Sequence, residues 1–358
     1  MNEIRHAPAI VLTHGWLKEI NAKTCHGLLR GSDRFRVLAV IDEKYAGQDA
    51  GVVMDGRPLG IPVFSSVLEY LNSDMPMPQY CVVGVAFSGG KLPADFRSEL
   101  LTAIDNGLSV VCGLHTFLSD DPEMSAHAAA AGVQLIDVRK PKPRHELHFW
   151  SGAIYDVKTP RIAVLGTDTA LGKRTTCRFL MEMCRRNGIL AEMIYTGQTG
   201  WMQGYKHGLI FDSTVNDFIS GEIERVLLEC VRDSKPDLIL IEGQSSLRNP
   251  SGPCGSEFLR SGDVKGVVLQ HAPGRKYYDH DPKWGLIPPV ETEIDLIKMY
   301  GAEVLAITLN EEHMEEVEME EYRRNLAART GLPVIRPLKE GVEALLPVIQ
   351  AYMENKQQ

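Results

Sequence analysis

Short apolar runs alternate with helix-like stretches along the first half of the chain. The runs are rich in aliphatic and β-branched residues, end in polar or glycine-containing turns, and lack regularly alternating polar positions. Such runs are typical of strands buried on both faces of a parallel sheet. The pattern predicts strands at residues 9–13, 36–41, 81–86, 108–113 and 134–137, and helices at 95–106 and 122–131.

The second half shows the same alternation. The pattern predicts strands at residues 162–165, 191–195, 237–241, 266–270, 304–309 and 333–337, and helices at 175–186, 215–232, 294–300, 315–329 and 341–354. Strands that alternate with helices indicate a doubly wound parallel sheet. We therefore expect α/β architecture in both halves.

A basic, proline-containing segment separates the halves. Residues 139–144 hold two prolines and four basic side chains. Proline continues neither a helix nor a central strand, so the segment predicts an interdomain linker, with a basic anion-contacting patch as the alternative. Because 358 residues exceed the usual size of a single core, we expect two domains, residues 1–145 and 146–358.

Composition narrows the classes of partner. The net charge of −9 argues against nucleic-acid binding as the main role, and no apolar run reaches the length that spans a bilayer. The N-terminal residues lack a signal-peptide pattern. The seven cysteines are scattered, without the paired spacing of a zinc site. We expect a cytoplasmic protein with a small-molecule substrate and no bound metal, and we leave a homo-oligomer open.

A glycine-rich segment at residues 161–176 carries the most specific chemistry. An apolar run ends at Gly166, and a loop follows that Gly172 and Lys173 close before a predicted helix. In this order, backbone N–H groups converge on an anion, the helix dipole adds positive charge, and a lysine reaches across. The segment predicts a P-loop NTPase-like α/β domain after an N-terminal Rossmann-like doubly wound parallel sheet. The candidate phosphate-binding residues are Gly166, Thr167, Asp168, Thr169, Gly172, Lys173, Arg174, Thr175 and Thr176.

Two details depart from the common phosphate loop. Five residues separate Gly166 from Gly172 where four are usual, and Arg174 stands where a Ser or Thr hydroxyl usually ligates Mg²⁺. A guanidinium cannot ligate a metal cation, but it adds charge next to phosphates. We expect phosphate binding, with Mg²⁺–nucleotide chemistry as the alternative if Thr175 takes the metal position.

Polar residues follow other predicted strands of the second half. Glu242 ends a buried strand, where it would face the ligand of the phosphate loop as a general base or metal ligand. Its alternative role is to cap a neighbouring helix. His271 is the other candidate proton acceptor, with a structural role as its alternative. The candidate substrate-binding residues are Gly197, Gln198 and Thr199, Asp217, Gln244, Arg275 and Lys276.

Several of these segments have a plainer interpretation. The loop at residues 195–200 is rich in backbone donors that suit an anion, but it also fits a tight turn. Asp212 and Asp217 are suited to an ammonium group, and Asp212 is equally suited to capping the helix expected near residue 215.

Other polar positions carry less chemical information. Asp42 follows a predicted strand, as a ribose-binding carboxylate would, but no GxGxxG motif precedes it. His115 also follows a strand, and a lone histidine is more often structural. The acidic run at residues 311–321 has helical spacing, and we expect it to be a solvated face.

Taken in order, such segments resemble a bacterial family described as a domain of unknown function and associated with D-glutamate N-acetyltransferase activity. The resemblance spans nearly the whole chain. Its short motifs begin at Gly27, Val40, Ala46, Ser88, Gly113 and Asp137 in the first half, and at Gly166, Gly172, Thr196, Ile241 and His271 in the second. The phosphate loop and Glu242-Gly243 also look like those of dethiobiotin synthetase, which has a hydroxyl residue in place of Arg174.

The family resemblance implies acetyl transfer from acetyl-CoA to the amino group of D-glutamate, a step in D-amino-acid catabolism. On this interpretation the phosphate loop holds CoA phosphates, Arg275 or Lys276 pairs with a substrate carboxylate, and Glu242 or His271 accepts a proton. Two other classes stay open. One is an ATP- and Mg²⁺-dependent ligase or kinase with Thr175 and Glu242 on the metal. The other is a non-catalytic sensor of nucleotides or CoA esters.

Overall fold

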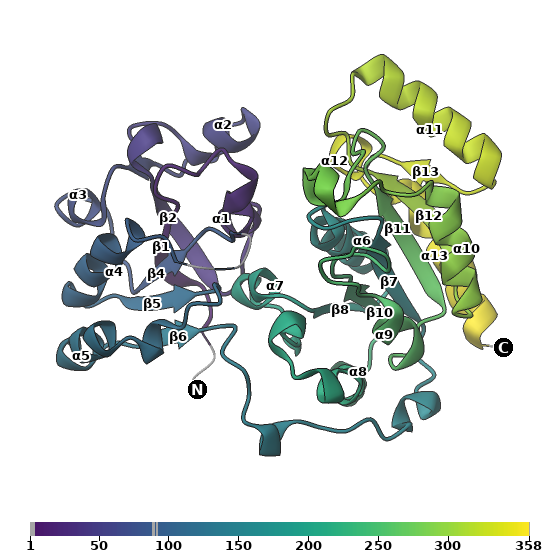
Figure 1. Ribbon diagram of the computed structural model, residues 1–358, viewed down its shortest axis with the longest axis horizontal. Helices are drawn as coiled ribbons and strands as arrows, with labels where there is room; N and C mark the ends of the chain where they lie inside the picture. The colour runs from purple at the N-terminus through teal and green to yellow at the C-terminus, as the bar shows by residue number, and fades with distance from the viewer. Residues whose placement is uncertain (1–3, 88–89, 91, 358) are drawn as a thin grey trace. The chain divides into compact units, whose positions relative to one another are not determined.

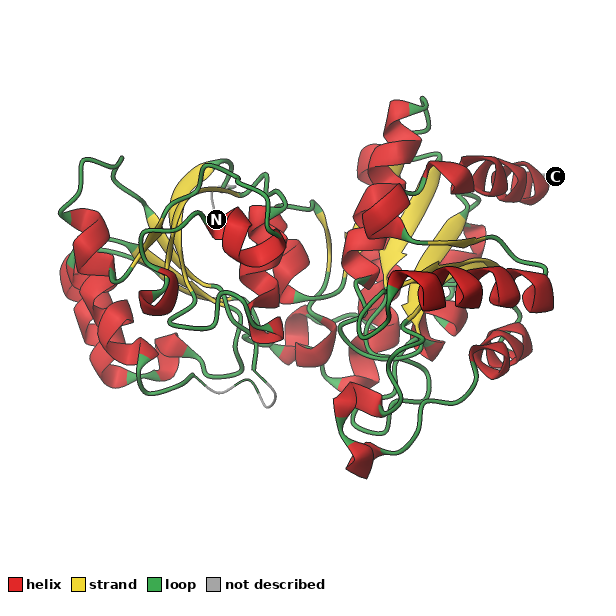
Figure 2. Ribbon diagram, turned by 90° about the horizontal axis from the view of Figure 1, so that it is seen from above, coloured by secondary structure: helices red, strands yellow, loops and turns green. Residues whose placement is uncertain are grey.

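A computed structural model describes residues 4–87, 90 and 92–357 and divides the chain into two compact units. Unit 1 comprises residues 1–141 and 198–205, and unit 2 comprises residues 142–197 and 206–358. In each unit a parallel β-sheet lies between helices (Figure 1, Figure 2). None of the described helices is long and apolar enough to cross a membrane. The α/β architecture predicted from the alternation of strands and helices is confirmed.

Unit 1 is built on a six-stranded parallel sheet with the order β3-β2-β1-β4-β5-β6. Its strands are β1 (Ala7–Leu12), β2 (Phe35–Ile41), β3 (Val63–Phe64), β4 (Tyr80–Val83), β5 (Ser109–Cys112) and β6 (Leu135–Asp137). Its helices are α1 (Lys23–Leu29), α2 (Ala50–Asp55), α3 (Val67–Leu71), α4 (Phe96–Asp105), α5 (Pro122–Ala131) and α7 (Gln198–Gln203). The strand order changes direction between β1 and β4, as in a doubly wound sheet.

Unit 2 is built on a seven-stranded parallel sheet with the order β13-β12-β11-β7-β10-β8-β9. Its strands are β7 (Arg161–Gly166), β8 (Ala191–Tyr195), β9 (His207–Gly208), β10 (Leu238–Glu242), β11 (Gly266–His271), β12 (Glu303–Leu309) and β13 (Val334–Ile335). Its helices are α6 (Lys173–Arg186), α8 (Ile219–Ser234), α9 (Ser256–Arg260), α10 (Val290–Met299), α11 (Glu316–Thr330), α12 (Pro337–Glu340) and α13 (Leu346–Gln357). Strand β7, which leads into the phosphate loop, is therefore central.

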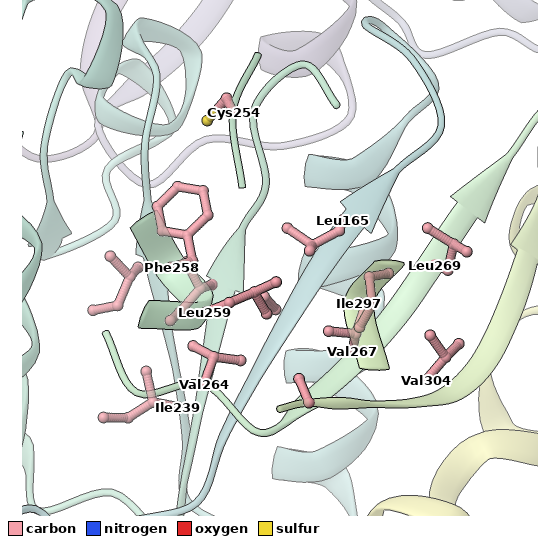
Figure 3. Packing of buried hydrophobic residues seen from close by; sticks show 14 of the residues in the cluster. Leu165, Ile239, Cys254, Phe258, Leu259, Val264, Val267, Leu269, Ile297 and Val304 are labelled. Atoms are coloured by element: carbon pink, nitrogen blue, oxygen red, sulfur yellow. The ribbon is translucent and has the colours of Figure 1, made fainter. Parts of the chain in front are cut away.

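The core of unit 2 explains why its central strands read as continuous apolar runs. Every residue of β7, β10 and β11 is buried. Figure 3 shows Leu165 of β7 and Val267 of β11 in the same apolar cluster as Phe258 of α9 and Ile297 of α10. Because helices cover both faces of these strands, no position along them needs to be polar.

Two buried glutamates of α8 hold the segment that follows the basic stretch. Glu222 lies 3.0 Å from Lys142 Nζ, and Glu224 accepts hydrogen bonds from the backbone N–H groups of Ser151 (2.6 Å) and Ile154 (3.2 Å). Burial alone would raise the pKa of Glu222, but hydrogen bonds, the strongest of them from Arg225, lower it to about 2. The chain after residue 141 is thus fixed to unit 2.

Element boundaries differ from the sequence expectations where turns intervene. The helix expected from residue 215 begins at Ile219, because residues 211–213 and 216–218 form separate 3₁₀ turns, so Asp212 does not cap it. Strand β13 is shorter than residues 333–337 because prolines flank it. Helix α10 begins at Val290, four residues earlier than expected.

Residues 198–205 leave the second half of the chain and join unit 1, which was not predicted from the sequence. Met202 is fully buried there, in a cluster with residues of β1, β2 and α1. Gln203 Nε2 donates to the carbonyl oxygens of Gly27 (2.8 Å) and Gly31 (3.1 Å). Helix α7 is therefore part of the packing of unit 1.

This assignment predicts a unit-specific effect of Met202→Ala. Removing a fully buried methionine should lower the free energy of unfolding by about 2–5 kcal/mol. Hydrogen exchange should show weaker protection in β1 and β2, and unchanged protection in β7 and β10. Met299→Ala is the matched control, because Met299 is 83% exposed. Lost protection confined to β7 and β10 would contradict the assignment of α7 to unit 1.

Candidate functional site

The phosphate loop joins the carboxyl end of β7 to the start of α6. Gly172 is the N-cap of α6 and has a φ of +97°, a conformation that favours glycine. At Gly166 a Cβ atom would lie 3.0 Å from Lys173 Cδ, so a side chain there would displace the lysine. The first N–H groups of α6 have no carbonyl one turn earlier in the helix, and they face the loop as anion donors.

Lys173 is buried and folds back over the loop. Its Nζ donates to the carbonyl oxygens of Asp168 (2.6 Å) and Ser245 (2.8 Å). Burial lowers the pKa of Lys173 to about 8 against the attraction of Asp168. An anion bound beside the ammonium group would favour its charged form and raise this pKa.

The Asp168 carboxylate is fully buried and bonds three groups outside the loop. Its Oδ1 accepts from Asn249 Nδ2 (2.7 Å), and its Oδ2 accepts from Arg275 Nη1 (2.9 Å) and Asp279 N (2.8 Å). Both oxygens are therefore committed to the protein. We assign the Asp168 side chain to support of the loop rather than to ligand contact, which corrects its sequence assignment.

Arg275 also has its partners inside the protein. Its guanidinium bonds Asp168, both carboxylate oxygens of Glu312 and the carbonyl oxygen of Thr169. The side chain is 1% exposed. This geometry disfavours the expected pairing of Arg275 with a substrate carboxylate. Its neighbour Lys276 is exposed, with Nζ 5.2 Å from the ring of Tyr277.

Glu242 is a buried carboxylate at the end of β10, which pairs with β7, the strand that leads into the phosphate loop. Its backbone pairs with Val164 of β7. Its Oε2 accepts from Thr196 N at 3.2 Å, and its Oε1 lies 3.9 Å from Arg174 Nη1. Burial raises the pKa of Glu242, and Arg174 opposes part of that rise. The structure thus brings together the candidate base and the arginine of the phosphate loop.

The segment after β8 divides between the units. Thr196 Oγ1 donates to the carbonyl oxygen of Glu242 (2.8 Å) and accepts from Gln244 Nε2 (3.0 Å). A Cβ atom on Gly197 would lie 2.9 Å from this Gln244 nitrogen. Thr196, Gly197 and Gln244 therefore lie around Glu242.

The next two predicted substrate-binding residues belong to unit 1 instead. Gln198 begins α7, and Thr199 Oγ1 lies 3.1 Å from Thr24 Oγ1 of α1. The predicted loop is therefore partly helix. Asp217 lies in an exposed 3₁₀ turn before α8.

His271 links the phosphate loop to α11. Its Nδ1 lies 3.0 Å from Thr167 Oγ1, and its Nε2 lies 3.0 Å from the Tyr322 hydroxyl. Burial lowers the pKa of His271 to about 4, so the ring is neutral near pH 7. Because both nitrogens have partners, the geometry favours Glu242 over His271 as the proton acceptor.

The threonines at the start of α6 differ in their surroundings. Thr176 is buried, and its Oγ1 donates to Gln270 Oε1 (2.7 Å), which also accepts from Thr308 Oγ1 (2.7 Å). Its side chain therefore faces the sheet. Helix α6 begins at Lys173, so Arg174 is its second residue and Thr175 its third. This start of the helix disfavours the shift of the loop by one residue that would bring Thr175 to the metal position.

The polar candidates of unit 1 have neighbours within that unit. Asp42 is buried and accepts from Thr13 Oγ1 (2.7 Å) and Leu17 N (2.9 Å), which favours a structural role over ribose binding. His115 is exposed, and its ring fills the space beside Gly90. Ser88, Gly89 and Lys91 of the motif at residues 88–93 lie outside the described residues.

The residues that support the loop were not predicted from the sequence. Asn249 and Asp279 bond Asp168, and Glu312 neutralises Arg275. The acidic run was expected to be entirely solvated, but this is wrong for Glu312, whose side chain is 18% exposed. Its position three residues after β12, at the carboxyl edge of a predicted parallel sheet, was the available signal.

A parallel sheet whose central strand leads through a glycine loop into a helix defines a P-loop α/β domain. A family described as a domain of unknown function (DUF1611), C-terminal P-loop domain, matches residues 148–346. The N-terminal Rossmann-like domain of the same family matches residues 43–141. The chain belongs to the DUF1611 family.

Two named enzymes and one solved structure are similar to this chain over most of its length. It is 29% identical over 277 residues to a D-glutamate N-acetyltransferase of Tritonibacter scottomollicae, with 75% of this chain and 80% of that protein covered. A D-glutamate N-acetyltransferase of Pseudoalteromonas sp. is 28% identical over 276 residues, covering 74% and 79%. The crystal structure of a DUF1611 family protein from Anabaena variabilis matches with a TM-score of 0.87 and 31% identity, covering 96% and 99%.

The buried His271 predicts a stability that depends on pH. Its folded-state pKa of about 4 lies below the ordinary value of 6.5, so the unfolded chain binds the proton first as the pH falls. Between about pH 6.5 and pH 4.5 this group should remove about 2 kcal/mol from the free energy of unfolding. Urea unfolding at about pH 7 and pH 4.5 should show a smaller loss in His271→Asn than in the wild type. Equal losses would contradict this account.

Proposed function

We propose that the protein is an N-acetyltransferase that transfers the acetyl group of acetyl-CoA to the amino group of D-glutamate. The similarity over three quarters of the chain to two proteins named D-glutamate N-acetyltransferase carries the proposal. The site supports it through two features: a phosphate loop without a hydroxyl after its lysine, and a buried carboxylate beside that loop.

The phosphate loop suits the phosphates of CoA. CoA carries a pyrophosphate and a 3′-phosphate, which need backbone donors and positive charge. The start of α6 supplies N–H groups, and Lys173 and Arg174 supply the charge. Lys173 Nζ bonds the carbonyl oxygens of Asp168 and Ser245 in the free protein, and in the proposed complex a phosphate replaces one of them. Gly172 leaves the ligand side of the helix start open.

The reaction needs a neutral amine. The ammonium group of D-glutamate first loses a proton, and its nitrogen then attacks the thioester carbonyl carbon. The new C–N bond forms as the C–S bond breaks. The nitrogen loses a second proton once it is bonded to the acetyl group, and CoA leaves as a thiolate that takes up one proton. The products are therefore N-acetyl-D-glutamate, CoA and one proton.

Glu242 is the side chain that we assign to proton removal. Its raised pKa makes its carboxylate a stronger base than an exposed glutamate, and the Thr196 N–H holds one of its oxygens in place. The positive charge of Arg174 favours the ionised form of Glu242, which is the form that accepts a proton.

The first test is acetyl transfer without metal or nucleotide. Purified protein, acetyl-CoA and D-glutamate are incubated in EDTA, and N-acetylglutamate is detected by mass spectrometry. We expect product from D-glutamate, and strongly reduced product from Lys173→Ala, because the loop loses its central charge. Absence of product, together with Mg²⁺-dependent ATP turnover, would overturn the proposal in favour of a ligase or kinase.

The role of Glu242 is tested by Glu242→Gln, which keeps the shape and removes the basicity. We expect kcat to fall by about 10²–10⁴, with little change in KM for acetyl-CoA. Glu318→Gln is the control, because Glu318 is exposed on α11. A loss of less than about tenfold would remove Glu242 from the role of general base.

A further inference from the structure

We infer that Arg174 takes the place of a divalent cation in this phosphate loop. Its guanidinium, beside Glu242, supplies the counter-charge for a phosphate group, and the loop binds its ligand without metal. The inference concerns the loop of the proposed function and rests on it for the identity of the ligand, CoA.

The inference starts from the two positions that hold Mg²⁺ in P-loop enzymes. One is the hydroxyl residue directly after the loop lysine, and the other is a carboxylate at the end of a nearby strand. In this chain these positions correspond to Arg174 and Glu242, on α6 and β10. Their side chains lie 3.9 Å apart, as an ion pair. A positive side chain therefore points to the carboxylate that would otherwise face the metal.

The residues around this ion pair do not fit Mg²⁺. The guanidinium has only donors and repels a cation. The Asp168 carboxylate is committed to Asn249, Arg275 and Asp279, and the Thr176 hydroxyl is committed to Gln270. Thr175 is two positions after the lysine, whereas the hydroxyl that ligates Mg²⁺ is usually one position after it. The loop thus keeps the anion-binding part of the fold without its metal-binding part.

Arg174 is placed to contact a ligand phosphate in addition to the Glu242 carboxylate. It is the second residue of α6, where first-turn N–H groups and the helix dipole already favour an anion. Its side chain is 21% exposed, against 6% for Glu242, so the guanidinium lies toward the open side of the pair. A planar guanidinium can bond a carboxylate and a phosphate at once through different N–H groups.

This arrangement selects a class of ligand. A metal-bound nucleoside triphosphate brings its own cation, which Arg174 would repel. A metal-free diphosphate such as the pyrophosphate of CoA lacks that cation and needs a fixed positive charge. The loop should therefore prefer phosphate esters free of Mg²⁺ over Mg²⁺–nucleotides.

The test is calorimetric binding of CoA and of inorganic pyrophosphate, each in EDTA and in Mg²⁺. For wild-type protein we expect CoA affinity to change by less than about twofold between the two conditions. Arg174→Thr should weaken CoA binding in EDTA by about tenfold or more, since one charge-assisted contact is lost. Mg²⁺ should restore part of this affinity, because threonine now stands at the metal position.

Two further variants keep the test decisive. Arg174→Lys keeps a point charge and should lose less CoA affinity than Arg174→Thr. It also provides a second variant to measure if the threonine variant folds poorly. Arg186→Thr is the control, because Arg186 lies at the other end of α6 and its side chain is 61% exposed. Unchanged affinity in Arg174→Thr would overturn the inference, as would wild-type binding of CoA that requires Mg²⁺.

Pyrophosphate separates this inference from the proposed function. Binding of pyrophosphate in EDTA that depends on Arg174, without acetyl transfer, would leave the inference standing and reject the transferase. Acetyl transfer with unchanged CoA affinity in Arg174→Thr would reject the inference alone. Failure of both probes to bind the wild type in EDTA would also overturn it.

Discussion

The buried Asp168 carboxylate is the interaction on which the phosphate loop depends. It accepts hydrogen bonds from Asn249, Arg275 and the backbone of Asp279, which come from two separate segments, one after β10 and one after β11. Removing one partner of such a buried pair typically costs about 3–5 kcal/mol, since it leaves an uncompensated charge. The shape of the loop is therefore set by a residue inside it that has no capacity left for the ligand.

The same constraint extends outward through Arg275. This guanidinium is shared between Asp168 and Glu312, so one buried positive charge faces two carboxylates. Thr169 Oγ1 donates to Asp279 Oδ1 (2.9 Å), which joins the loop a second time to the segment after β11. Asp279 has a positive φ of 49°, an uncommon conformation held by these bonds. Rigidity of this kind keeps the N–H groups at the start of α6 in place before a ligand arrives.

Much of this architecture follows from local sequence. The buried strands were predicted because continuous apolar runs suit sheets covered on both faces. The phosphate loop was predicted because an apolar run, a glycine-containing loop, a lysine and a helix follow one another in that order. Helix α5 was placed well because Pro122 begins it, Asp121 caps it, and Gly132 ends it with a φ of +69°. Glu242 was located beside the loop from the rule that parallel strands end at one edge.

Long-range pairings were beyond this reasoning. That α7 joins unit 1 depends on the burial of Met202 and on bonds from Gln203 to α1, which no local pattern encodes. Likewise, Arg275 was assigned to a substrate carboxylate because its strand-end position is suitable, whereas two carboxylates distant in sequence already surround it. A charged residue at a strand end indicates an electrostatic role, but the sequence does not say whether its partner is ligand or protein.

The ion pair of Arg174 and Glu242 connects binding to chemistry under the roles proposed above. In the free protein the guanidinium lowers the pKa of a carboxylate whose burial raises it. If Arg174 turns part of its charge to a ligand phosphate, Glu242 loses some of that stabilisation, and its pKa should rise further. A carboxylate that is more basic with CoA bound accepts a proton more readily from the incoming ammonium group. One side chain would thus serve the phosphate loop and also adjust the base, a coupling that a hydroxyl at this position could not provide.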